Sequence, residues 1–240
     1  MNPASVGFQC PQCIGRDRAQ TRQPRTRFGG RLGTRDAPVT KVLMIVAGAS
    51  FVLNILSQGL LNALLAQSNY AIASGQLWRL ITVSFTSAGL LSTALSVFVL
   101  FIVGRALEGV LGSGRFLVVY LLSSLGGATV FFLVAPLGAG LVGGSGSVIG
   151  LLAANAAVKL RSREDIKPDL VLLALLVGVN FAIGSVYGGL GQLGGTVAGL
   201  LTGLVLAFAP RDKRTPVQVL GVSAIVAVCL AATLAKIALV

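Results

Sequence analysis

The feature that most constrains this chain is a series of apolar runs, each long enough to cross a membrane as a helix. We expect spans at about 42–66, 90–110, 116–134, 143–159, 170–186, 191–208 and 217–240. A helix needs about 20 apolar residues to cross the hydrocarbon core. In a chain of 240 residues that is 55% hydrophobic and 11% charged, these runs predict an all-α polytopic membrane protein.

The charges lie in short clusters between the apolar runs. A net charge of +12 would suit nucleic-acid binding, but clustered Lys and Arg are typical of loops kept on the cytoplasmic side. With seven spans and a cytoplasmic N-terminus, only Arg79 and Lys236 fall toward the outer side. We therefore expect no nucleic-acid partner, contact with membrane lipid, and a multi-pass protein of a bacterial plasma membrane with its C-terminus outside.

The composition divides the chain into three parts. Residues 1–41 form a basic tail with few apolar side chains, which predicts disorder. About 40 such residues precede the first apolar run, unlike the early apolar region of a signal peptide. Residues 42–209 hold six expected spans, and 210–240 hold a basic loop and a seventh.

Cys10 and Cys13 form a CxxC pair, which is half of a typical zinc site. Structural zinc takes four ligands, but the chain has no histidine and its third cysteine, Cys229, lies within an apolar run. We expect no closed metal site within one chain. The pair is either an orphan or is completed by a second chain or by upstream sequence.

A serine stands between glycines at the start of the fourth run, in Gly143-Gly144-Ser145-Gly146. Small residues four apart allow membrane helices to approach closely. The fourth run has such a pair in Gly146 and Gly150. The sixth run has a longer row, made of Gly191, Gly195, Gly199 and Gly203. These faces can pack on one another, and Ser145 is then either a packing residue or a nucleophile.

Several motifs resemble those of the rhomboid family of intramembrane serine proteases, over residues 74–209. In chain order they are Trp78-Arg79, Gly104-Arg105-Ala106-Leu107-Glu108, Gly112-Ser113-Gly114-Arg115-Phe116, Gly143-Gly144-Ser145-Gly146 and the pair Gly195 and Gly199. The resemblance implies a six-helix core, here followed by a seventh helix. It implies that Glu108 has a role in the fold, which we expect to be a pairing with Arg105 or Arg115.

The resemblance implies that Ser145 is the nucleophile and that a histidine stands three residues before Gly195. That position is Gln192 here. The family's oxyanion-hole positions on the second helix correspond to Ser87 or Ser92 for a histidine and to Ser96 for an asparagine. The backbone N–H of Gly144 can also contribute.

A carboxamide cannot act as a general base near neutral pH. In a soluble serine protease, loss of the base costs about a millionfold in turnover. We therefore predict an inactive or strongly impaired protease that needs no cofactor and can bind transmembrane segments of other proteins. The oligomeric state is left open.

Two alternatives remain. One is an active protease with an unconventional base, for which Lys236 is the candidate, although we expect Lys236 to extend to the membrane surface. The other is a transporter or channel. No acid lies within an expected span except Glu108 at a helix end, which disfavours ion coupling.

Overall fold

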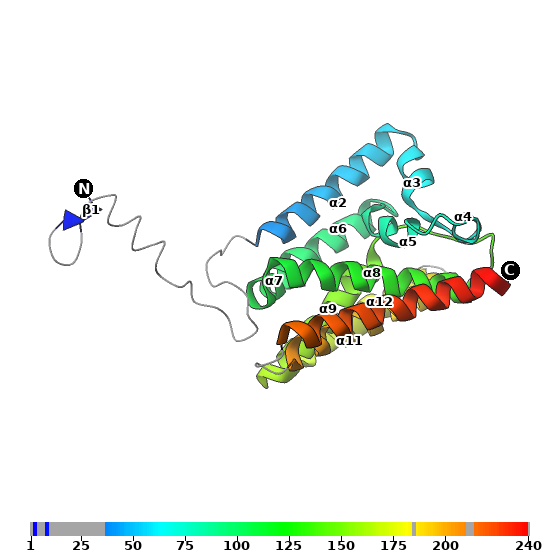
Figure 1. Ribbon diagram of the computed structural model, residues 1–240. Helices are drawn as coiled ribbons and strands as arrows, with labels where there is room; N and C mark the ends of the chain where they lie inside the picture. Colours follow the sequence, from blue (N-terminus) through cyan, green and yellow to red (C-terminus); the bar gives the residue numbers. More distant parts are fainter. Residues whose placement is uncertain (1, 4–7, 10–36, 184–185, 210–213, 240) are drawn as a thin grey trace.

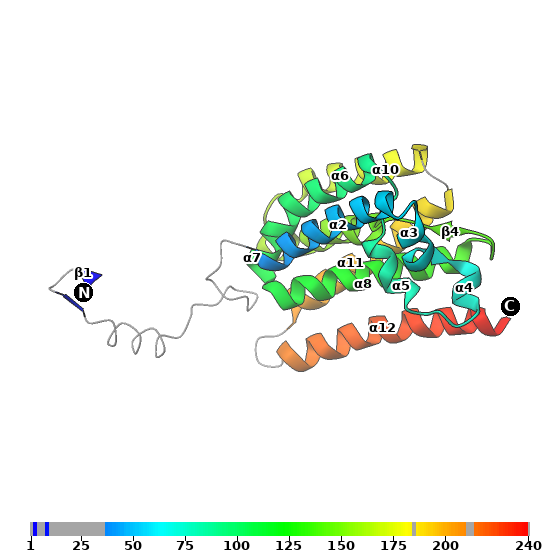
Figure 2. The same cartoon turned by 90° about the horizontal axis from the view of Figure 1, so that it is seen from above.

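Three helices form the centre of the molecule: α8 (Ser113–Val134), α9 (Ser145–Ser162) and α11 (Val186–Phe208). They run side by side in both views of the computed structural model (Figures 1 and 2). The structure describes residues 2–3, 8–9, 37–183, 186–209 and 214–239. The predictions for Cys10, Cys13 and most of the basic tail lie outside the described residues.

Three of the four glycines in the row on α11, Gly195, Gly199 and Gly203, lie directly against α9, as the four-residue spacing allowed, whereas Gly191 lies against α8. A Cβ atom built on Gly195 would lie 2.5 Å from the carbonyl oxygen of Gly146, and one on Gly199 would overlap the backbone of Gly150. A Cβ on Gly203 would lie 2.8 Å from Cα of Ala154. Glycine is therefore required at the contact of these two backbones.

Helix α8 covers a second side of α11 through glycines that we had not assigned to packing. A Cβ on Gly127 would lie 2.9 Å from the carbonyl oxygen of Gly191, and one on Gly126 would overlap Ala198. Helix α11 is thus held between two close-packed neighbours. Its position relative to α9 is fixed from both sides.

The other elements surround this centre. They are α2 (Pro38–Leu56), α3 (Leu60–Leu65), α4 (Asn69–Ala73), α5 (Arg79–Thr82), η1 (Val83–Phe85), α6 (Leu90–Val99), η2 (Leu100–Gly104), α7 (Arg105–Leu111), α10 (Lys167–Ile183) and α12 (Arg214–Leu239). Two short strands, β3 (Gln67–Ser68) and β4 (Gly140–Leu141), pair antiparallel, and so do β1 (Asn2–Pro3) and β2 (Phe8–Gln9).

The helices confirm the prediction of an all-α polytopic membrane protein. Five described helices, Pro38–Leu56, Leu90–Leu111, Ser113–Val134, Val186–Phe208 and Thr215–Leu239, are long and apolar enough to cross a membrane. The expected first span, 42–66, is divided into α2 and α3. Gln58 and Gly59 have φ of 51° and 91°, which ends α2. The count of six core spans plus one stays a prediction.

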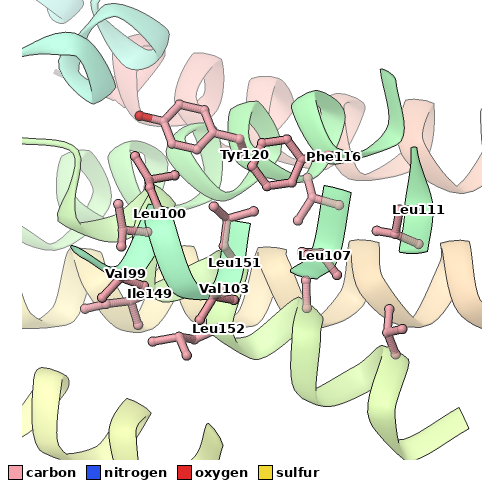
Figure 3. Close-up of a cluster of buried hydrophobic side chains, with 14 of the residues drawn as sticks. Val99, Leu100, Val103, Leu107, Leu111, Phe116, Tyr120, Ile149, Leu151 and Leu152 are labelled. Carbon is pink, nitrogen blue, oxygen red and sulfur yellow. The ribbon is translucent and has the colours of Figure 1, made fainter. Parts of the chain in front are cut away.

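A cluster of buried apolar side chains joins α6, η2 and α7 to α8 and α9 (Figure 3). Phe116 of α8 and Leu151 of α9 lie in it together with Leu107 of α7, and all three are fully buried. This cluster packs the α6–α7 segment against the central helices. It therefore holds α6, the helix that carries Ser92 and Ser96, in place.

Glu108 joins α7 to the start of α2. Its carboxylate accepts hydrogen bonds from the Val39 N–H, from the Thr40 N–H and hydroxyl at 2.7 Å each, and from the Ser113 hydroxyl at 2.6 Å. The first N–H groups of a helix have no partner within it, and a carboxylate satisfies them well. Glu108 has the expected role in the fold, but these partners are not the expected Arg105 or Arg115.

Lys236 of α12 lies at the end of α8, and its extension to the membrane surface stays a prediction. Its ammonium donates to the carbonyl oxygens of Phe132, Leu133 and Ala135, where α8 ends. It also lies 5.0 Å from the centre of the Phe132 ring. A cation is favourable at a helix C-terminus, where several carbonyls have no intrahelical partner. Lys236 therefore anchors α12 to α8.

We predict that Gly199→Ala separates α9 from α11, because the added methyl group would overlap the Gly150 backbone. The expected cost is about 2 kcal/mol or more in the free energy of unfolding, as for overpacked cores. The matched control is Gly178→Ala in α10, where a Cβ meets nothing within 4 Å. Thermal unfolding in detergent measures both. Equal midpoints for the two variants would contradict the close packing.

Candidate active site

Ser145 and Gln192 meet where α9 and α11 are in close contact. Ser145 is the first residue of α9, and Gln192 lies near the start of α11. The Gln192 side-chain amide, through Nε2, donates a hydrogen bond to Ser145 Oγ at 3.1 Å. The structure therefore brings together the serine and the residue at which the motif resemblance implies a histidine, although they are 47 positions apart in sequence.

The backbone before Ser145 is fixed by its surroundings. Gly143 has a φ of 98°, a conformation that favours glycine, and its N–H donates to the Thr86 hydroxyl at 2.8 Å. A Cβ on Gly144 would lie 2.5 Å from the carbonyl oxygen of Ser84. Both glycines of the motif are needed to bring the chain this close to the segment between α5 and α6. They set the place at which α9 begins.

The Gln192 side chain is buried and only half satisfied. It is 6% exposed, and its Oε1 has no hydrogen-bond partner among the described residues. Leaving a buried polar atom unpaired costs about 1–3 kcal/mol. The cost of this unpaired oxygen is not expected for Gln192 if its only role is packing.

A cavity of about 610 Å³ adjoins this pair. Its walls come from α6, the β4 segment, α9, α10 and α11. Its polar side chains are Ser92, Ser96, Ser145, Asn180 and Gln192. None of the described residues that line it is ionisable. This volume lies within the range of ligand-binding clefts.

The structure separates the two serines proposed for the second-helix histidine position. Ser92 lines the cavity together with Ser145, whereas the Ser87 hydroxyl is 2.7 Å from the Thr93 hydroxyl and does not line that cavity. Ser96, on the same face of α6, also lines the cavity. The sequence reasoning missed Asn180 of α10. The sequence feature that could have identified Asn180 is its position as a single polar residue within an apolar run.

The geometry has a direct chemical consequence. Because Nε2 is a donor, Ser145 Oγ accepts this hydrogen bond and its own proton is not held by a base. Lys236 donates its hydrogen bonds to three carbonyl oxygens at the end of α8. Among the described residues, neither side chain accepts a hydrogen bond from Ser145, as a general base in acyl transfer would.

Comparison with known proteins shows the family of this chain. The sequence model of the rhomboid domain matches residues 74–209. The rhomboid protease GluP of Bacillus subtilis (strain 168) is 31% identical over 146 residues, which cover 59% of this chain and 28% of GluP. The rhomboid-family protein YdcA of the same organism is 33% identical over 151 residues, covering 61% of this chain and 73% of YdcA.

A plant protein is also similar. RHOMBOID-like protein 6, mitochondrial, of Arabidopsis thaliana is 28% identical over 148 residues, covering 59% of this chain and 47% of the relative. Because the domain match covers more than half of the sequence, this chain belongs to the rhomboid family of membrane proteins. The matched part is less than half the length of GluP and of the plant protein.

We predict that Gln192→Leu leaves stability unchanged or raises it by about 1 kcal/mol, because it removes one hydrogen bond together with an unpaired buried oxygen. The control is Gln218→Leu. Gln218 is equally buried, but it accepts from Arg115 Nε at 3.0 Å and donates to the Leu206 carbonyl at 3.1 Å. We expect that control to lose about 2 kcal/mol. Similar losses in the two variants, measured by unfolding in detergent, would contradict this account.

Proposed function

We propose that this chain is a rhomboid-family protein with absent or strongly impaired proteolysis, which binds transmembrane segments of other proteins. The observation that carries the proposal is the hydrogen bond from Gln192 Nε2 to Ser145 Oγ. The rhomboid fold, the serine and the adjoining cavity are kept, but the group facing the serine donates a hydrogen where catalysis requires an acceptor.

The loss of turnover expected without a general base supports this proposal. A base both removes the serine proton and later protonates the leaving amine. In a soluble serine protease its loss costs about a millionfold in turnover, or about 8 kcal/mol. The serines at positions 92 and 96 supply hydroxyl donors, which leave this deficit in proton transfer unchanged.

The proposal includes an orientation. Helices α3–α5 and the C-terminus lie at one end of the molecule, and the start of α2 and helix α7 lie at the other end (Figure 1). Arg79 is the first residue of α5 and Lys236 lies in the last turn of α12, so both belong to the first end. The basic residues near the second end, Lys41 and Arg105 among them, suit a cytoplasmic face. Ser145 then lies near the outer face.

We predict no cleavage of a model transmembrane substrate above the background of Ser145→Ala when both purified proteins are assayed in the same lipid. The physical reason is the missing base. Cleavage that the wild-type protein performs and Ser145→Ala loses would overturn the proposal. In that case Lys236→Met would test the unconventional base.

Gln192→His serves as a matched variant in the same assay. Imidazole can accept the Ser145 proton from this position near neutral pH, so we expect Gln192→His to cleave measurably more than wild type. Gln192→Asn keeps a carboxamide and should stay at background. Activity in Gln192→Asn would show that the cleavage does not depend on a base at position 192.

A further inference from the structure

The cavity beside Ser145 is lined by two hydroxyls that have no hydrogen-bond partner among the described residues. Several other helical Ser and Thr side chains donate to a carbonyl of their own helix, among them Ser50, Ser123, Thr196, Thr202, Ser223 and Thr233. Ser92 and Ser96 make no hydrogen bond within the described part of the chain, although both lie on α6. They are free to bind an occupant of the cavity.

Asn180 lies on the opposite wall, on α10. It lines the same cavity, and its Nδ2 donates to the Leu176 carbonyl at 2.8 Å. That bond leaves the side-chain oxygen, Oδ1, as the atom with which Asn180 can accept a hydrogen bond. Across the cavity, α6 thus offers two donors and α10 offers an acceptor. Such a pair of walls suits a group that both accepts and donates.

The residues around these polar groups show where an occupant comes from. Leu90 and Leu91 line the cavity and are 69% and 66% exposed, so the cavity extends to the apolar outer surface of α6. On α10, Val171 and Leu175 are also exposed. In a membrane these surfaces face lipid, so an occupant reaches the cavity from within the bilayer.

The uncharged character of the described lining residues limits which kinds of molecule can occupy the cavity. Among the described residues, no cationic side chain lines it to pair with a lipid phosphate, and no acidic side chain lines it to pair with a cation. An acyl chain would bury the hydroxyls of Ser92 and Ser96 and the amide of Asn180 without partners. An apolar helix that carries one uncharged polar side chain satisfies both the apolar surface and the polar groups.

We propose that Ser92, Ser96 and Asn180 form a recognition site for a partner's transmembrane helix that carries an uncharged amide side chain, such as Asn or Gln. An amide has a carbonyl to accept from the two serines and an NH₂ to donate to Asn180 Oδ1. This inference rests on the proposed binding of transmembrane segments and names what that binding selects. It requires no reaction at Ser145.

The test compares two probes on the full chain in phospholipid nanodiscs. Both are fluorescent 24-residue Leu/Ala transmembrane peptides, one with Leu and one with Asn at its centre. We expect the Asn peptide to bind about threefold to tenfold more tightly, which corresponds to about 0.7–1.4 kcal/mol and lies within what hydrogen bonds between membrane helices contribute. Fluorescence titration measures both dissociation constants.

Variants of the cavity residues test whether those residues cause the preference for the Asn peptide. Asn180→Leu and the double variant Ser92→Ala with Ser96→Ala should each bind the two peptides equally and keep the affinity for the Leu peptide. The matched control is Ser223→Ala on α12, which removes an exposed hydroxyl outside the cavity and should keep the wild-type preference. A preference that survives in both cavity variants would overturn the inference.

The remaining outcomes separate this inference from the proposed function. Equal binding of both peptides to the wild-type protein would overturn the recognition site and leave the binding of transmembrane segments standing. No binding of either peptide would overturn both. A photoreactive residue in place of Leu91 should cross-link the Asn peptide, and adducts with lipid or a second copy alone would overturn the recognition site.

Discussion

The contact between the backbones of α9 and α11 is the interaction on which the rest of the structure depends. The Cβ of any residue larger than glycine at positions 195 or 199 would overlap α9. Close approach of two helices gives packing energy that lipid cannot replace. It also brings the first residue of α9 within hydrogen-bonding distance of α11, so the same constraint that stabilises the core creates the pairing of Ser145 with Gln192.

The hydrogen bond between these two residues has a defined donor and acceptor. A histidine in place of Gln192 could accept a proton from the serine, whereas the carboxamide nitrogen donates to it. The buried, unpaired Oε1 shows that the carboxamide is not optimised for stability. The fold thus holds the serine in place, and the chemistry depends on a single side chain on the facing helix. Lys236 binds carbonyl oxygens at the end of α8 rather than Ser145.

Periodic features of the sequence predicted much of this arrangement. The apolar runs gave the long helices, and glycines four apart on α11 gave the α9–α11 contact, because spacing on one helix face is a local property. The predicted partner of Glu108 was wrong and the contacts of Lys236 were not foreseen, since each side chain binds backbone groups at the end of another helix, which no spacing encodes. Asn180 was missed because its position opposite Ser92 and Ser96 depends on how α10 packs.

The division of α2 from α3 was also missed. A left-handed turn at Gln58 and Gly59 breaks an apolar run that hydropathy alone treats as continuous. The motif comparison predicted that Ser145 and Gln192 would be neighbours, and in the structure Gln192 Nε2 lies 3.1 Å from Ser145 Oγ. The direction of their hydrogen bond required the structure, because it depends on which side-chain atom of Gln192 faces the serine.

The most direct test of the central claim is the rate at which a fluorophosphonate modifies Ser145 between pH 6 and pH 10, with Ser145→Ala as the blank. A serine without a base reacts only through its rare alkoxide. The account therefore predicts slow labelling whose rate rises about tenfold per pH unit, without an inflection. Fast labelling that reaches a plateau near neutral pH would show that a base serves Ser145 and would contradict the account.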